Sequence, residues 1–168
     1  MSVAAPATLG RPRLAFMRMQ ASVARRLFAT ARVARLATAD AEGVPHLVPV
    51  TFAMDGEDVV SAVDAKPKTT AALRRLRNIT ANPRVSVLVD HYEEDWSRLW
   101  WVRADGHATV AHTDERAIAA LTAKYPPYLR TPPAGPVVRI RITTWRGWSA
   151  SSDVPTPDRF AGCPPYQR

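Results

Sequence analysis

A cluster of cations without acidic neighbours is the feature of this sequence with the clearest chemical use. Six basic residues and no acid occur from position 66 up to Asp90, and two of the three lysines of the chain, Lys66 and Lys68, are among them. These lysines precede a helix that we predict from Thr69 to about Ile79, whose N-terminal end carries the positive end of the helix dipole. A bound phosphate would turn this repulsion into attraction, because backbone N–H groups and lysine side chains would converge on it. The cluster therefore predicts a phosphate site.

The predicted helix carries Arg74, Arg75 and Arg77, which extend the cationic track. Arg74 and Asn78 are expected to point away from the core face of the helix. A solvated basic surface is the plain alternative, but the paired lysines and the absence of acids one helical turn from the arginines argue against it. A nucleic-acid surface is a second alternative. It would interleave aromatic residues with the cations, whereas the tryptophans of this region lie at positions 96 to 101.

The composition indicates one globular domain with an anionic partner. Of 168 residues, 46% are hydrophobic and 23% are charged, and the net charge is +8. No apolar run approaches the ~20 residues that span a bilayer, so no membrane segment is expected. The single cysteine, Cys163, excludes a disulfide framework and favours the cytoplasm. The four histidines show no metal-ligand spacing, so no metal site is predicted.

Three segments organise the chain. We expect a disordered N-terminus at residues 1–13, a folded domain at 14–150 and an irregular tail at 151–168. The first acid is Asp40, which gives the N-terminal region the composition of a transit peptide. Apolar residues at helical spacing predict instead an amphipathic helix over Leu14–Ala29 that packs on the domain.

Alternation of apolar and polar residues predicts six strands, at 32–39, 45–54, 58–63, 84–90, 100–111 and 137–145. We expect the first three to form a meander, with a tight turn at Asp55-Gly56, and the fifth to break at Asp105-Gly106. Thr113-Asp114-Glu115 is expected to cap a helix that ends at Lys124, with acids in its first turn. A loop with five prolines follows at 125–136. This order predicts a small antiparallel β-barrel with helical covers, and no Gly-rich Rossmann or P-loop motif is present.

Several segments resemble a known family, over about residues 28–148. They are Arg35-Leu36-Ala37-Thr38, the segment from Gly43 to Phe52, and Asn78-Ile79 with Asn82-Pro83-Arg84-Val85. These segments are similar to those of the split β-barrel flavin-binding proteins, which are related in fold to pyridoxamine 5'-phosphate oxidase. Within that group the chain most resembles the class that uses the deazaflavin coenzyme F420. The stretches 90–96, 99–103 and 106–108 resemble one branch of this class.

The resemblance implies a mainly β fold, a six-stranded antiparallel split β-barrel, and a homodimer with cofactor sites at the interface. It implies an oxidoreductase that transfers hydride between F420 and an unsaturated or quinone-like small molecule. An FMN-dependent reductase or oxidase of the same fold is the first alternative. A non-catalytic carrier of F420 or flavin, or a basic nucleic-acid-binding module, is the second.

The resemblance also implies roles for particular residues. Lys66 and Lys68 are the first choices for phosphate contacts, followed by Arg74, Arg75 and Arg77. Family members often carry an Arg-Lys pair where this chain has Arg74-Arg75, and the change alters the geometry of the donors. The cofactor ring is expected against Val48, Pro49, Val50 and Thr51, and the substrate against Trp100, Trp101 and His46. Pro49 cannot donate to a strand ladder, so it is expected at a bulge or beside a bound group.

Overall fold

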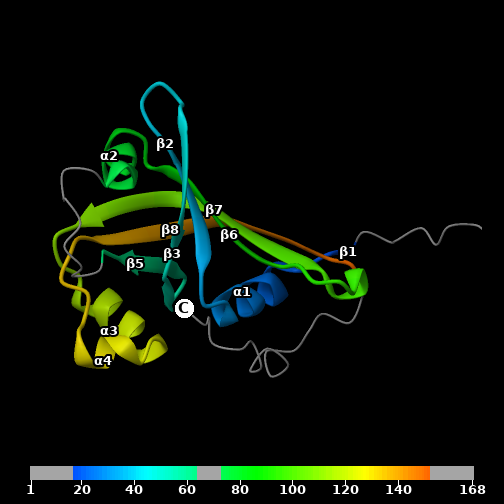
Figure 1. Cartoon of the computed structure of the whole chain (residues 1–168). Helices are drawn as coiled ribbons and strands as arrows, with labels where there is room; N and C mark the ends of the chain where they lie inside the picture. Colours follow the sequence, from blue (N-terminus) through cyan, green and yellow to red (C-terminus); the bar gives the residue numbers. More distant parts are fainter. Residues whose placement is uncertain (1–16, 64–72, 152–168) are drawn as a thin grey trace, which may run out of the picture.

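The chain forms one curled antiparallel sheet with helices at its ends (Figure 1). The computed structural model describes residues 17–63 and 73–151. The strands are β1 (Met17–Arg18), β2 (Ala34–Ala39), β3 (Pro45–Val50), β4 (Ala53–Asp55), β5 (Asp58–Ala62), β6 (Arg84–His91), β7 (Trp100–Ala111) and β8 (Val137–Ser149). The helices are α1 (Ala21–Thr30), α2 (Arg74–Ala81), the 3-10 turn η2 (Trp96–Arg98), α3 (Glu115–Lys124) and α4 (Pro127–Arg130).

The strand order explains how the sheet becomes a barrel. It runs β3-β2-β6-β7-β8-β5-β4, with β1 paired to β8. The end strands β3 and β4 are consecutive in the chain and separated only by Thr51 and Phe52, so the sheet must curl until its edges meet at this bend. No ladder joins β3 to β4 in the described part of the chain, so the sheet is not closed. The predicted mainly β, split-barrel architecture is confirmed.

Tertiary pairing changes several predicted details of the sheet. The predicted meander is confirmed in its two hairpins, since β2 pairs with β3 and β4 pairs with β5 across the Asp55-Gly56 turn. It is wrong for the main part of the middle strand, because β3 does not pair with β5, whose other neighbour is β8. The described residues form eight strands where six were predicted, since the bend divides the second predicted strand and β1 adds to β8. The fifth predicted strand does not break at Asp105-Gly106. It continues as β7, and its register against β8 shifts there so that Thr143 is left over as a bulge.

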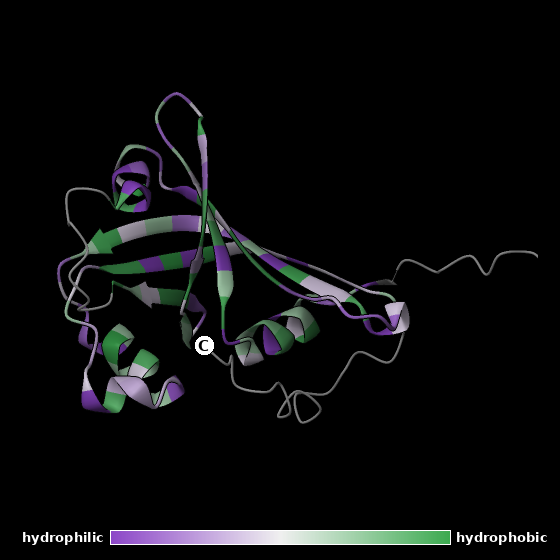
Figure 2. Cartoon of the chain, viewed as in Figure 1, coloured by the Kyte–Doolittle hydropathy of each residue, from purple (hydrophilic) through white to green (hydrophobic). Residues whose placement is uncertain are grey.

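The barrel interior is filled from the inward faces of the strands and by α1. Along β6, Val85, Val87 and Val89 are buried while the residues between them are less so, and Figure 2 shows similar alternation of hydropathy along β7 and β8. The ring centroid of Phe28 on α1 lies 4.8 Å from that of Phe52 at the bend and 5.1 Å from that of Trp145 on β8. The α1 helix therefore plugs one opening of the barrel.

The N-terminal helix is shorter than predicted. It begins at Ala21, because Met17–Arg18 pairs with β8 and Met19 donates a backbone hydrogen bond to Gly147 at 3.0 Å. Residues before position 17, including the predicted disordered segment, lie outside the described residues, as does most of the predicted tail.

Helix α3 covers a second face of the sheet and begins at the predicted cap segment. Asp114 accepts the backbone N–H of Ala117 at 3.0 Å, which confirms it as the N-cap. Leu121 and Tyr125 pack with Val60 and other residues of β4, β5 and β8 in a second apolar cluster. The predicted 125–136 loop contains the short helix α4. No helix within residues 17–63 and 73–151 is long and apolar enough to cross a membrane.

Candidate functional site

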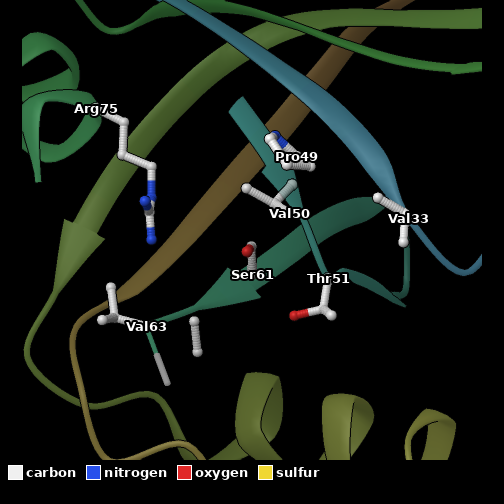
Figure 3. A pocket seen from close by; sticks show the side chains of 8 residues that line it. Val33, Pro49, Val50, Thr51, Ser61, Val63 and Arg75 are labelled. Carbon is white, nitrogen blue, oxygen red and sulfur yellow. The ribbon is translucent and has the colours of Figure 1, made fainter. Parts of the chain in front are cut away.

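A pocket of about 220 Å³ lies where the two edges of the sheet meet (Figure 3). The ends of β3 and β5, the bend after β3 and helix α2 all contribute to it. Its lining residues are Val33, Pro49, Val50, Thr51, Ser61, Ala62, Val63 and Arg75. The pocket therefore depends on the curl of the sheet, because β3 and β5 are distant in the strand order.

Arg75 is the charged residue of this pocket. Figure 3 shows its side chain extending from α2 into the space between Val50 and Val63, on the side of the Ser61 hydroxyl. No acidic side chain is among the described residues that line the pocket. A guanidinium group that faces aliphatic side chains and two hydroxyl groups can bind an anion with directional hydrogen bonds.

Polar contacts hold helix α2 against β2 and thereby fix the backbone position of Arg75. The Nδ2 atom of Asn78 donates to Oγ1 of Thr38 at 3.1 Å, and both residues are buried. Arg74 donates to Asp40 at 3.3 Å. The expectation that Asn78 points away from the core is wrong, since the helix turns this residue onto β2, where its amide finds the Thr38 hydroxyl. Helix α2 is observed from Arg74 to Ala81, and residues 69–72 of the predicted helix lie outside the described residues.

Two tyrosines hydrogen-bond to the bend that forms one side of the pocket. Tyr125 follows the end of α3, and Tyr128 lies on α4. The Thr51 hydroxyl lies 3.0 Å from the Tyr128 hydroxyl. The Tyr125 hydroxyl accepts the backbone N–H of Phe52 at 3.0 Å. Its single O–H hydrogen faces the carbonyl oxygens of Arg32 and Phe52, each 2.8 Å from the phenol oxygen, and can be donated to one of them or shared. Burial raises the pKa of Tyr125, which keeps the phenol protonated as a donor.

Lys124 packs on the same bend. Its Nζ atom lies 3.7 Å from the centroid of the Phe52 ring. Burial, and secondarily the charge of Arg32, lowers the pKa of Lys124 to about 8. The ammonium group is held by the aromatic face, with no hydrogen-bond partner among the described residues.

The structure brings together only part of the predicted site. Pro49, Val50, Thr51 and Arg75 line the pocket, and Pro49 lies on the edge strand β3, where its missing N–H interrupts no inner ladder. Val48 packs against the barrel core. The remaining predicted phosphate-binding residues are not among the described residues that line the pocket. Arg74 pairs with Asp40 and Arg77 is exposed, while Lys66 and Lys68 lie outside the described residues.

The predicted substrate residues lie away from this pocket in the same chain. Trp100 is buried in the core, and the half-buried Trp101 is paired with Asp90 and Trp148 at the far end of β7. His46 is half-buried on β3 opposite Thr38. None of the three lines the pocket, so each remains a prediction for the substrate site.

Sequence reasoning missed four contributors to the pocket, Val33, Ser61, Ala62 and Val63. A usable signal was present for residues 61–63, because they lead directly into the segment that carries the lysine pair. Val33 gave no such signal, because it precedes β2 and reaches the pocket only through the curl of the sheet.

A second cluster of charged residues, at the β4–β5 hairpin, has a different character. Arg139 on β8 contacts the carboxylates of Asp55, Asp58 and Asp114 at 2.8 to 3.1 Å. Hydrogen bonds from Arg139 and then Arg116 hold the pKa of Asp55 below its usual value. This cluster joins β4, β5, β8 and the start of α3, so we assign it to stability.

Comparison with known proteins identifies the family. The sequence profile described as pyridoxamine 5'-phosphate oxidase matches residues 22–149, and the chain belongs to this family. Among curated proteins, none matches the chain significantly.

Solved structures share the fold at low sequence identity. A FAD-binding protein from Mesorhizobium loti is 22% identical, with a TM-score of 0.63 over 82% of this chain and 99% of that one. A FAD-binding protein from Mycobacterium smegmatis is 19% identical, with a TM-score of 0.54 over 78% and 94% of the two chains. HutZ, a heme storage protein from Vibrio cholerae, is 20% identical, with a TM-score of 0.57 over 75% and 92%.

Proposed function

We propose that this member of the pyridoxamine 5'-phosphate oxidase family is an oxidoreductase that uses a flavin-type cofactor, with coenzyme F420 as our first choice. The observation that carries the proposal is the pocket at the meeting of the sheet edges, where Arg75 faces aliphatic walls and the hydroxyls of Thr51 and Ser61. An anionic group and a flat ring on one molecule match these two kinds of surface.

The residues present fit such a cofactor. Arg75 supplies charge-assisted hydrogen bonds to a phosphate, and the walls at Val50 and Val63 exclude water from an adjoining ring. Lys66 and Lys68, outside the described residues, are the proposed contacts to a phosphodiester or a carboxylate-rich tail. The cofactor supplies hydride transfer, and the protein supplies binding, orientation and shelter. An unsaturated or quinone-like small molecule is the proposed acceptor.

We infer that the protein is a cytoplasmic homodimer. The β2–β3 hairpin exposes apolar side chains, with Leu47 64% and Val44 47% exposed. A second copy would cover this surface. Sedimentation at micromolar concentration tests the inference, and a monodisperse monomer would contradict it.

Titration of the apo protein with F420 and FMN, each in separate experiments, tests the cofactor. We expect F420 to bind more tightly than FMN and to support reduction of a quinone. Tight binding of FMN without binding of F420 would show that FMN, and not F420, is the cofactor. A third titration with hemin is warranted, because HutZ and a heme-binding protein from Mycobacterium smegmatis share the fold. Hemin binding without flavin or F420 binding would favour a non-catalytic carrier.

The basic track can be tested separately. Replacing Lys66 and Lys68 together by Ala should weaken cofactor binding by about 2–4 kcal/mol, because each charge-assisted contact contributes roughly 1.5–3 kcal/mol and the pair is not additive. The free energy of unfolding should hardly change. If affinity is unchanged and stability falls, the lysines are structural.

A further inference from the structure

Lys124 carries a positive charge that no acid balances within the described residues. It is the last residue of α3, and its Nζ atom is buried without a hydrogen-bond partner there. The salt bridges within residues 17–63 and 73–151 do not include it. A buried ammonium group without a counterion is unfavourable unless its surroundings compensate for the lost water.

The surroundings of Lys124 compensate only in part. Its Nζ atom lies 3.7 Å from the centroid of the Phe52 ring and 5.7 Å from that of Tyr125, and both ring faces attract a cation. Arg32 donates to the carbonyl oxygen of Lys124 at 2.9 Å, but its charge repels the ammonium group. Burial, and then this repulsion, lower the pKa of Lys124 to about 8. The other titratable side chains described in this cluster are the phenols of Tyr125 and Tyr128, which carry no charge at neutral pH. An anion nearby would supply the missing negative charge.

Lys124 lies directly behind one wall of the pocket. Phe52, whose ring contacts the ammonium group, follows Thr51 in the bend, and Thr51 lines the pocket. Figure 3 shows Thr51 on the side of the pocket that faces the helices. Consecutive Cα atoms are about 3.8 Å apart, so the ammonium group and a ligand in the pocket would be separated by roughly 10 Å.

The material between Lys124 and the pocket is packed protein. Phe52 and Tyr125 are both buried. Two unit charges roughly 10 Å apart, at an effective dielectric constant of about 20 to 40, change a binding equilibrium by roughly four- to sixteenfold. Lys124 can therefore stabilise an anion that it does not touch, while Arg75 approaches the same space from α2.

We propose that Lys124 acts as a second cation of the pocket from behind the Thr51-Phe52 bend, so that binding of an anionic cofactor and protonation of Lys124 favour each other. This rests on the proposed cofactor pocket and adds a dependence on pH to it. The affinity for an anion is highest where Lys124 is protonated, and it declines as pH rises through about 8. Lys124 contributes charge and no contact, so it is a positioning residue for the ligand.

The FMN affinity of three proteins between pH 7 and 9.5 tests the proposal. We expect the affinity of the wild type to fall about fourfold over this range, the lower end of the Coulomb range because the pocket is open to water. Lys124→Arg keeps a charge that does not titrate, so its affinity should stay within about twofold across the range. Lys124→Met should show no decline and should bind FMN as the wild type does at pH 9.5. A structural role alone would change affinity without changing its pH profile, and identical profiles in the wild type and Lys124→Arg would overturn the proposal.

A ligand-free measurement uses the reciprocity of the coupling. Arg75→Glu places a negative charge at the pocket and should raise the pKa of Lys124 by about half a unit or more, followed by NMR of isotope-labelled lysine Cε atoms. The chain has three lysines, so Lys124→Arg assigns the signal. Arg18→Glu is the matched control with the same change of charge. Arg18 pairs with Trp148, whereas Val137, at the opposite end of β8, packs with α3. The control should leave the pKa of Lys124 unchanged.

The two measurements separate this proposal from the cofactor assignment. A raised pKa in Arg75→Glu, in a protein whose wild type binds neither FMN nor F420, would refute the cofactor and retain the coupling. FMN binding without a raised pKa would refute the coupling and retain the cofactor. Equal shifts in Arg75→Glu and Arg18→Glu would also refute the coupling, because they would report the net charge of the chain.

Discussion

Arg139 and Arg75 belong to the same end of the molecule but have opposite surroundings. Arg139 is held by the carboxylates of Asp55, Asp58 and Asp114, which tie two strands and a helix to β8. Arg75 extends from a short helix into a pocket whose described lining contains no acid. Arg139 is neutralised by these carboxylates, whereas Arg75 faces a space that a ligand can enter. The position of the guanidinium group, inside the fold or beside an open pocket, distinguishes a structural role from a proposed binding role.

Replacement of Arg139 should have the largest effect on stability. Arg139→Leu leaves three carboxylates close together without their common partner, so we expect the free energy of unfolding to fall by about 3 kcal/mol. Urea denaturation measures this. Arg116→Ala is the matched control, because Arg116 contacts Asp55 from a largely exposed position, and it should cost about 0.5 kcal/mol or less. Equal losses in the two variants would contradict the assignment of Arg139 to stability.

The same variant should alter the response to acid. The folded-state pKa of Asp55 is lowered chiefly by the hydrogen bond from Arg139, so Asp55 contributes stability above its ordinary pKa of 3.8 that is lost as pH falls through the lower folded-state value. Arg139→Leu should flatten this loss below pH 3.8, measured by thermal unfolding across acid pH. An unchanged acid dependence would assign the pKa shift to Arg116.

Replacement of Arg75 should affect ligand binding much more than stability, the reverse of the result expected for Arg139. Arg75→Ala should weaken FMN or F420 binding by about 2 kcal/mol, the contribution of one charge-assisted hydrogen bond, and change stability by less than about 0.5 kcal/mol. Arg141→Ala removes one charge from an exposed site on β8 and should leave affinity nearly unchanged. If both variants lose affinity equally, net charge governs binding and the pocket does not.

The anchor beneath Arg75 should show a smaller, coupled effect. Asn78→Leu and Thr38→Val each leave one buried polar group without its partner, and each should cost about 1–2 kcal/mol of stability. The double variant should cost less than the sum, because neither polar group remains. Chemical denaturation of the four proteins of this cycle gives the coupling energy. Strict additivity would show that the 3.1 Å hydrogen bond contributes nothing.

Lys124 should give the smallest effect, and its pH dependence should appear in the alkaline range. Its folded-state pKa of about 8 lies below its usual 10.5, so the unfolded chain binds more protons between these values and stability rises with pH there. We expect a gain of about 1 kcal/mol between pH 8 and 9.5, reduced from the full linkage value because the side chain is partly exposed. Lys124→Met should abolish the gain. Higher pH is avoided because Tyr125, with its raised pKa, acts in the opposite direction.

The fold was more predictable than the site because strand patterns are local. Alternating apolar residues located most of the long strands, and the Asp114 cap followed from its neighbours in sequence. The hairpin between β4 and β5 was predicted from its turn residues, but the other partner of β5 could not be, since pairing with β8 is decided by the curl of the whole sheet. The same curl brings Val33 to the pocket.

The prediction for Asn78 was wrong for a related reason, because its burial depends on a contact with a distant part of the chain. An asparagine on a short, arginine-rich helix looks like a surface residue, and only the Thr38 hydroxyl on β2 makes its burial favourable. The pocket residues Pro49 to Thr51 and Arg75 were found because they lie in segments that resemble the family. The tryptophans were expected beside them, although β7 carries Trp100 to the other end of the sheet.

The bend at Thr51-Phe52 has a consequence for folding kinetics. The β2–β3 and β4–β5 hairpins on either side of it can form early, because their partners are close in sequence. The pairing of Asp58 with Arg141 joins two strands that about half of the chain separates, and the bend reaches its final geometry only when that pairing forms. Such long-range strand pairing places refolding in the range of about milliseconds to seconds. Phe52 and Trp145, which contact Phe28 from both sides, should acquire their native packing in this slow step, so Trp145 fluorescence would report the formation of the pocket.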